Sequence, residues 1–148
     1  MIKAYVDSSW KDGIAGFGVY MVTNGVKERF FSNWIKTDNN NYGELWAIYQ
    51  AAIFCANRDA VIYTDSQTAL AYINGTVKDK ERTPEQYIRH QQMKVLAYKI
   101  NRLGVRCEFV KGHQHNEYDN NLADFLSKKG LDKHKKYMYN ERSGADIL

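Results

Sequence analysis

Residues 60–73 read AVIYTDSQTALAYI, and this stretch indicates the fold class more clearly than any other part of the chain. The short apolar run from Ala60 to Tyr63 is typical of a buried strand, and residues 66–73 follow it with helical spacing. Apolar residues also recur at helical spacing from Asn41 onward. A helix, a buried strand and another helix in that order predict a βαβ unit, so we expect an α/β fold.

Alternating stretches nearer the start predict an antiparallel beginning to the sheet. IKAYVD (residues 2–7) and GFGVYMVT (residues 16–23) alternate with period two. Asn24-Gly25 is a type I′ hairpin signal, and VKERFFSNWI (residues 26–35) follows it. Three antiparallel strands are therefore expected before the first helix.

The second half of the chain supplies the remaining elements. Pro84 begins a helix that reaches Gly104, and VRCEFV (residues 105–110) forms a fifth strand. A last helix is expected to end at a cap near Gly130, with residues 131–148 as a loose tail. We predict a five-stranded mixed sheet with helices on both faces, and a catalytic domain at residues 1–130.

Composition limits the class of protein. A chain of 148 residues fits one domain, and its net charge of +4 and pI near 9.0 favour polyanionic partners, although a basic solvated surface is the plainer interpretation. Cys55 and Cys107 lack ligand spacing and predict reduced core residues in a reducing compartment. The start is too short and polar for a signal peptide, and no apolar stretch approaches a membrane span, so we expect a cytoplasmic protein without membrane contact.

Four acidic residues are expected to converge at strand and helix ends: Asp7, Glu44, Asp65 and Asp124. Crowded carboxylates destabilise a fold unless a cation or a shared proton compensates, so such a cluster indicates a metal site. Taken singly, each acid has a plainer role. Asp65 with Ser66 is a helix cap, Asp7 a turn residue, Glu44 a partner of the helix dipole, and Asp124 an exposed acid.

The motifs around these acids resemble type 1 ribonuclease H. They follow one another in the family's order over residues 2–129: Asp7-Ser8-Ser9, Gly16 and Gly18, Asn40-Asn41-Tyr42-Gly43-Glu44-Leu45, Thr64-Asp65-Ser66-Gln67, Val110-Lys111-Gly112-His113, and Asn120-Asn121-Leu122-Ala123-Asp124. Independent motifs in the correct order are far more specific together than any one of them alone. The resemblance implies a ribonuclease H-like fold.

Three features depart from the family pattern. Ser8 stands where glycine is common, and His115 alters the loop before Asp124. The segment VKDKER (residues 77–82) is short and lacks the tryptophan-bearing basic protrusion of many bacterial members. The chain is therefore similar to members without that protrusion.

The resemblance implies two Mg²⁺ ions held by the four carboxylates, with Mn²⁺ able to substitute. Mg²⁺ prefers hard oxygen ligands, which argues against zinc at His113 and His115. His113 would aid proton transfer or product release. The implied reaction is endonucleolytic hydrolysis of the RNA strand of an RNA/DNA hybrid to 5′-phosphate and 3′-hydroxyl ends, by a monomer.

Substrate contacts follow from the same resemblance. Asn40, Asn41 and Gln67 match positions that contact the minor groove of the hybrid, where amides can both donate to and accept from the 2′-hydroxyl. Further substrate contacts are expected at Ser8, Ser9, Thr83 and Asn120. Two other functions remain open at this point: a hybrid-binding module without turnover, and a resolvase-like DNA nuclease on the same fold.

Overall fold

The computed structural model describes residues 1–111 and 117–147, and it describes the side chains of residues 1–111 and 121–140. One sheet has the strand order β3-β2-β1-β4-β5. Its strands are β1 (Ile2–Lys11), β2 (Ile14–Thr23), β3 (Val26–Lys36), β4 (Ala60–Thr64) and β5 (Arg106–Phe109). The first three pair antiparallel, whereas β4 runs parallel to β1 and β5 parallel to β4. The predicted five-stranded mixed sheet is confirmed.

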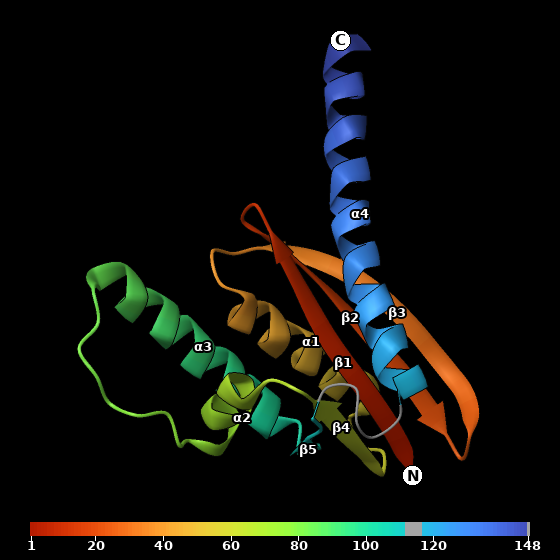
Figure 1. Ribbon diagram of the computed structural model, residues 1–148, viewed down its shortest axis with the longest axis vertical. Helices are drawn as coiled ribbons and strands as arrows, with labels where there is room; N and C mark the ends of the chain where they lie inside the picture. Colours follow the sequence, from red (N-terminus) through yellow and green to blue (C-terminus); the bar gives the residue numbers. More distant parts are fainter. Residues whose placement is uncertain (112–116, 148) are drawn as a thin grey trace.

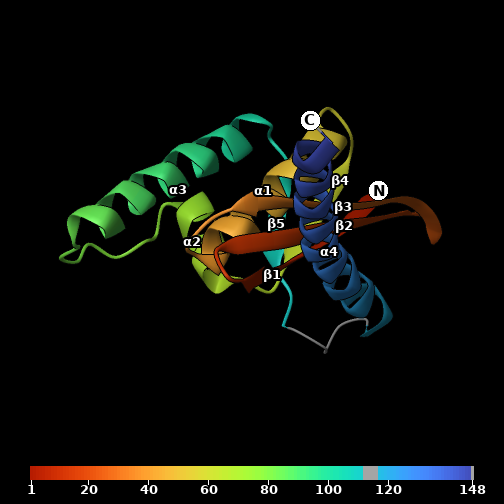
Figure 2. The same ribbon diagram turned by 90° about the horizontal axis from the view of Figure 1, so that it is seen from above.

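Helices connect and follow these strands: α1 (Asn40–Cys55), α2 (Gln67–Asn74), α3 (Pro84–Arg102) and α4 (Glu117–Ile147). The predicted start of α3 is confirmed, because Thr83 forms a capping box with Gln86 ahead of Pro84. Residues 75–83 link α2 to α3 without a helix or strand. Figures 1 and 2 show α2 and α3 on one side of the molecule, away from α4.

Separate apolar layers cover the two faces of the sheet, as alternation along the strands requires. On one face, Val6 and Val19 pack with Ile48 of α1 and Ile100 of α3. On the other face, β1 and β2 turn tyrosines toward Ala123 and Leu126 of α4: Tyr5 and Tyr20. The prediction of helices on both faces is therefore confirmed.

Strand β1 continues four residues beyond its predicted end at Asp7. It forms a hairpin with β2 through Asp12-Gly13, whose φ angles of 52° and 80° are those of a type I′ turn. Asp7 pairs with Gly18 of β2 in mid-strand, but the parallel pairing of β1 with β4 stops at Tyr5 and Tyr63. The prediction that Asp7 ends the strand is wrong, yet Asp7 still lies just past the carboxyl end of the neighbouring parallel strand.

Helix α4 does not end at Gly130, so the predicted cap is wrong. A Cβ atom at Gly130 would meet the backbone carbonyl oxygen of Asn33 and lie 2.9 Å from the Cα of Gly16. Gly130 is therefore a close-packing glycine, which lets the helix approach the sheet. The helix continues to Ile147, so residues 131–147 are helical and not the loose tail that the sequence predicts. Figure 1 shows α4 extending well beyond the sheet.

Both cysteines are free thiols, as predicted: Cys55 is buried and Cys107 partly buried. Burial raises the pKa of the Cys107 thiol to about 12, so it stays protonated at neutral pH. Within the described part of the chain, no helix has the length and apolar character needed to cross a bilayer.

Candidate active site

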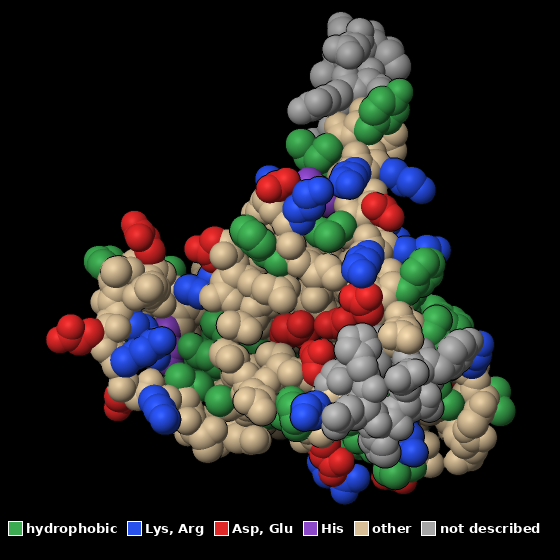
Figure 3. Space-filling model, in the orientation of Figure 1, with side chains coloured by type: hydrophobic (Ala, Val, Ile, Leu, Met, Phe, Trp, Pro, Cys, Tyr) green, Lys and Arg blue, Asp and Glu red, His purple; other side chains and the backbone are tan. Residues whose placement is uncertain are grey.

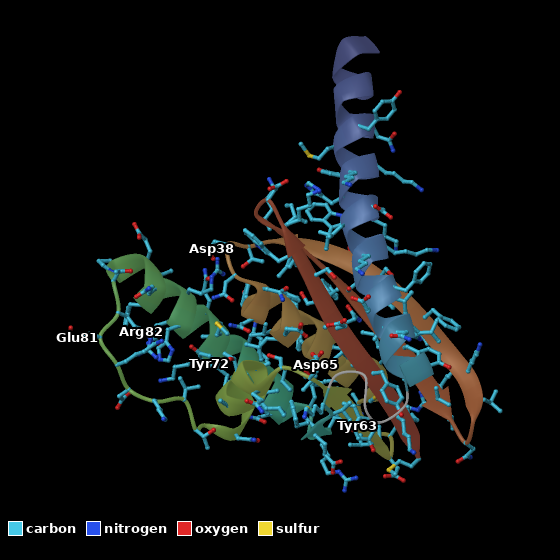
Figure 4. The ribbon with its side chains drawn as sticks, in the orientation of Figure 1. Asp38, Tyr63, Asp65, Tyr72, Glu81 and Arg82 are labelled. Atoms are coloured by element: carbon cyan, nitrogen blue, oxygen red, sulfur yellow. The ribbon has the colours of Figure 1, made fainter. Side chains whose placement is uncertain are left out.

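Three of the four predicted acids meet in space. Asp7 comes from β1, Glu44 from α1, and Asp65 from the residue after β4. Each offers a carboxylate oxygen, and these oxygens all lie within 4.8 Å of one another. This cluster is called the carboxylate triad below. Figure 4 labels Asp65 where β4 leads toward α2.

Glycine at position 43 brings Glu44 against the sheet. A Cβ atom at Gly43 would meet the Oγ of Ser8 and lie 2.6 Å from the Cβ of Ala15. No larger residue would let α1 lie so close to β1 and β2. The first turn of α1 is fixed as well, because the Asn39 side chain accepts a 2.7 Å hydrogen bond from the Asn41 amide.

Asp65 is not the cap of α2, although the sequence left that role open. Ser66 caps the helix, and its Oγ accepts a 3.1 Å hydrogen bond from the Ala69 amide. The Ser66 amide in turn donates to the Oγ1 of Thr64 at 3.1 Å. The neighbours of Asp65 thus satisfy the local backbone, and its own carboxylate belongs to the triad.

The triad holds its negative charge at a cost. Burial raises the pKa of Asp7 to about 7, and the nearby charges of Asp65 and Asp124 add to the rise, while the Ser8 amide, which donates at 2.9 Å, opposes it. Burial, followed by the charges of Asp7 and Asp65, raises the pKa of Glu44 well above its ordinary value. Without a cation, the cluster therefore favours bound protons at neutral pH.

Glu44 supplies the observation that best tests whether a metal fits. Its side chain is buried, and among the described residues its Oε2 atom has no hydrogen-bond partner. An unpaired buried carboxylate oxygen is costly, and a bound cation is the usual compensation. The donor set consists only of carboxylate oxygens, which suits a hard divalent ion such as Mg²⁺. The residues present therefore fit the metal that the sequence resemblance implies.

Asp124 lies outside the triad but beside Asp7, whose pKa it raises through its charge and a side-chain hydrogen bond. Its carboxylate also forms a 3.0 Å ion pair with the Nζ of Lys128, one helical turn later. Ser127 joins α4 to β1 next to this point, since its Oγ lies 2.7 Å from both the Ser9 Oγ and the Asp124 carbonyl oxygen. The sequence analysis did not single out Lys128, although its i,i+4 spacing from Asp124 was a usable signal.

The predicted substrate residues fall into two groups. Ser8 is buried and donates a 2.8 Å hydrogen bond to the Oδ1 of Asn40, so these two side chains hold each other beside the triad. Asn41, Gln67 and Thr83 instead line an open groove of about 800 Å³. The structure therefore brings the acids together at one place and three of the polar residues together at another.

This groove runs between the start of α1, α2, residues 75–83 and α3, and its wall is basic. Lys78, Lys80 and Arg82 line it from the linking segment, and Arg89 lines it from α3. Arg89 is held in place by a 2.6 Å ion pair with Asp38. Figure 4 labels Arg82 on the segment between α2 and α3.

Two further predicted residues cannot be placed in the site. His113 lies outside the described residues. Asn120 lies in α4, but its side chain is outside the part that the structure describes. The roles expected for both residues stay predictions.

The geometry can be set against known proteins. A family model described as RNase H matches residues 1–132. The chain belongs to the ribonuclease H family. A ribonuclease H of Pseudomonas fluorescens (strain Pf0-1) is 26% identical over 144 residues, which cover 92% of this chain and 94% of the relative. A ribonuclease H of Pseudomonas entomophila (strain L48) is 27% identical over 139 residues, covering 88% and 93%.

Solved structures agree on the ribonuclease H fold. The crystal structure of RNase H1 from Halobacterium salinarum NRC-1 matches with a TM-score of 0.69 at 20% identity, covering 89% of this chain and 98% of that one. The structure of LC11-RNase H1 in complex with an RNA/DNA hybrid matches with a TM-score of 0.59 at 22% identity, covering 90% and 99%. The ribonuclease H-like fold predicted from the motifs is confirmed.

Proposed function

We propose that this member of the ribonuclease H family is a metal-dependent endonuclease that hydrolyses the RNA strand of RNA/DNA hybrids, leaving 5′-phosphate and 3′-hydroxyl ends. The observation that carries the proposal is the carboxylate triad with its buried, unpartnered Glu44 oxygen. A cluster of this kind, within a chain that belongs to this family, is best explained by metal-assisted phosphodiester hydrolysis.

Asp7, Glu44, Asp65 and Asp124 would hold two Mg²⁺ ions, and Mn²⁺ would substitute. Bound Mg²⁺ supplies an activated water and stabilises charge on the leaving 3′ oxygen. The chain itself must keep the carboxylates ionised and in place. Ser8 contributes by donating its amide hydrogen to Asp7, which favours the charged form of that carboxylate. Lys128 contributes by pairing with Asp124.

Recognition of the hybrid is assigned to the amides near the triad and in the groove. Asn40 stands beside the triad, and Asn41 and Gln67 line the groove. Amide groups can donate to and accept from a ribose 2′-hydroxyl, which only the RNA strand carries. The related LC11-RNase H1 was solved with an RNA/DNA hybrid, which supports this substrate class. Basic residues of the groove would hold phosphates of the DNA strand.

The proposal is tested with three end-labelled duplexes of one sequence: an RNA/DNA hybrid, an RNA duplex and a DNA duplex. With Mg²⁺ or Mn²⁺ we expect cleavage of the RNA strand of the hybrid alone. Ca²⁺ should support binding with little turnover, because its larger and looser coordination misplaces the reacting oxygens. EDTA should abolish cleavage.

Other outcomes of this experiment identify the other functions. Binding of the hybrid without cleavage in any metal would indicate a binding module. Cleavage of the DNA duplex would indicate a resolvase-like nuclease. Hybrid cleavage that persists in EDTA would refute the metal mechanism.

The proposal extends to a monomer in the cytoplasm. A single chain carries all four carboxylates, which supports the monomer, and both cysteines are free thiols, which supports a reducing compartment. Light scattering on the purified protein tests the oligomeric state, and fractionation of the source cells tests the location.

A further inference from the structure

The middle of α4 carries a concentrated positive charge that the proposed reaction does not use. Between residues 128 and 136 the helix has a single acidic residue, Asp132. The same nine positions hold these lysines: Lys128, Lys129, Lys133, Lys135 and Lys136. Figure 3 shows red acidic side chains gathered near the base of α4, with blue basic side chains continuing along the helix above them.

Helical spacing separates these lysines into an anchored one and an exposed set. The face of α4 toward the sheet includes the buried Leu126 and Gly130. Lys133 reaches back to that side, where its Nζ donates to the Ser32 carbonyl oxygen at 2.6 Å. The other four lysines are exposed and lie on the opposite face, which is called the lysine face below: Lys128, Lys129, Lys135 and Lys136.

The lysine face begins at the active site. Lys128 follows Asp124 by four residues and pairs with it at 3.0 Å. Lys135 follows Lys128 by seven residues, so at 3.6 residues per turn the three side chains form one stripe along the helix. At about 1.5 Å per residue, Lys135 stands roughly 16 Å along the axis from Asp124. The positive charge therefore extends outward from a catalytic carboxylate in a fixed direction.

Contacts with β3 make this part of α4 a rigid support. The ring of Trp34 lies 4.7 Å from that of His134 and 5.4 Å from that of Tyr137. Together with the bond from Lys133 to Ser32, these contacts hold the helix to the sheet through residue 137. Lys135 and Lys136 stand on that anchored stretch, and the described part of the chain gives neither an ion-pair partner.

We propose that the lysine face of α4 binds the phosphate backbone of the substrate duplex where the duplex leaves the active site. The inference rests on the proposed function and adds a second nucleic-acid contact surface to it, distinct from the basic groove beside α2 and α3. Charge complementarity identifies the occupant. Exposed, unpaired lysines continuing from a site that acts on a phosphodiester match the regular negative charge of a duplex.

The distance sets a length requirement. A duplex carries a phosphate on each strand about every 3.4 Å along its axis, so a helix-borne lysine roughly 16 Å from the site is reached only by about five further base pairs. Only one of the two duplex arms flanking the cleavage site can lie along α4. The contribution of Lys135 and Lys136 must therefore depend on which arm is present.

The test compares the double variant Lys135→Ala/Lys136→Ala with a control that loses the same charge elsewhere, Lys3→Ala/Lys99→Ala. Lys128 is left intact because it touches Asp124. The probes are two DNA duplexes in which a short run of ribonucleotides lies at one end or the other of one strand, so each has a single flanking arm. Dissociation constants are measured in Ca²⁺ over a salt series, and thermal melting verifies that each variant is folded.

For one placement of the ribonucleotides, the α4 variant should lower the slope of log affinity against log salt by up to about 2, with about tenfold weaker binding per lost contact near 0.1 M salt. The other placement and the control variant should show no such difference. An unchanged slope for both placements, or an equal loss in the control, would overturn the proposal. An acidic protein partner for the lysine face would also appear as an unchanged slope.

The outcome is separable from that of the proposed function. Cleavage of the hybrid by the wild-type chain together with an unchanged salt slope in the α4 variant would refute the lysine face alone. A placement-dependent slope without cleavage in Mg²⁺ would support the lysine face and refute the nuclease.

Discussion

At the scale of single residues, Asp65 separates activity from stability. Removing its charge relieves repulsion on Asp7 and Glu44, both of which have raised pKa values because of it. Asp65→Asn should therefore abolish cleavage while raising the free energy of unfolding in EDTA by about 1 kcal/mol, the equivalent of one pKa unit. Single-turnover cleavage and urea unfolding of the variant measure the two effects.

The matched control is Asp12→Asn, an exposed acid in the hairpin turn whose positive φ angle of 52° asparagine also adopts readily. It should leave both activity and stability unchanged. If Asp65→Asn keeps a tenth or more of wild-type turnover at saturating Mg²⁺, the assignment of Asp65 to the metal site is wrong.

Asp7 gives the metal-free protein a specific pH dependence. Its folded pKa of about 7 lies above the unfolded value of 3.8, so between these pH values the folded state keeps a proton that the unfolded chain has lost. Stability should therefore fall as pH rises through this window, by at most about 4 kcal/mol for Asp7 alone, and should level off above it. Glu44 acts in the same direction.

Urea unfolding in EDTA at about pH 5 and about pH 8 measures this dependence. Asp7→Asn should flatten it, and saturating Mg²⁺ should restore stability at the higher pH by binding the ionised cluster. A metal-free protein that is more stable at the higher pH would contradict the electrostatics described for the triad.

At the scale of elements, Gly130 decides how closely α4 approaches the sheet. Gly130→Ala should lower the free energy of unfolding by about 1 to 3 kcal/mol, because the added methyl group would meet the Asn33 carbonyl oxygen and Gly16. Intrinsic helix propensity alone would change it by about 1 kcal/mol in the opposite direction. The sign of the change therefore distinguishes packing from propensity.

Chemical denaturation of Gly130→Ala provides the measurement, with Lys129→Ala as its control. Lys129 is the adjacent exposed helical residue, and its replacement should change stability by no more than about 0.5 kcal/mol. A stabilised Gly130→Ala would mean that the glycine does not pack against the sheet.

Most elements follow from local patterns in the sequence, and the errors have a common cause. The Asn24-Gly25 hairpin, the Thr83 cap and the buried strand at Ala60 depend on residues within a few positions, and all three are confirmed. The end of β1 was placed too early because the turn signal at Asp12-Gly13 was not used. Gly130 was misread because a glycine after lysines resembles a helix end, and only Gly16 on a distant strand shows otherwise.

The site shows the same division between local and distant information. The triad was predictable because acids at the ends of neighbouring elements must converge in an α/β sheet. The pairing of Ser8 with Asn40 could not be predicted, because it depends on how closely Gly43 lets α1 approach β1. The groove shared by Asn41, Gln67 and Thr83 likewise depends on the path of residues 75–83.

At the scale of the whole molecule, the packing of α4 tests where the folded unit ends. A chain cut after residue 130 loses Lys133, His134 and Tyr137, and with them the bond to Ser32 and the ring contacts with Trp34. It should unfold at lower denaturant concentration, with a loss of about 2 to 4 kcal/mol. A domain boundary at residue 130, as the sequence analysis places it, would instead predict no loss.

A second chain cut after residue 140 is the control, because it keeps every one of these contacts. It should match the full chain in urea unfolding to within about 0.5 kcal/mol. Equal stability of all three chains would show that residues 131–148 form a separable tail.

The position of Asp124 on the last described helix also has a meaning in the order of synthesis. The ribosome completes all five strands, and with them Asp7, Glu44 and Asp65, before it makes α4. A nascent chain therefore carries three of its four acids while one face of its sheet is still uncovered. Catalytic competence and the covering of that face arrive in the same step, so an interrupted translation product is both inactive and exposed to aggregation.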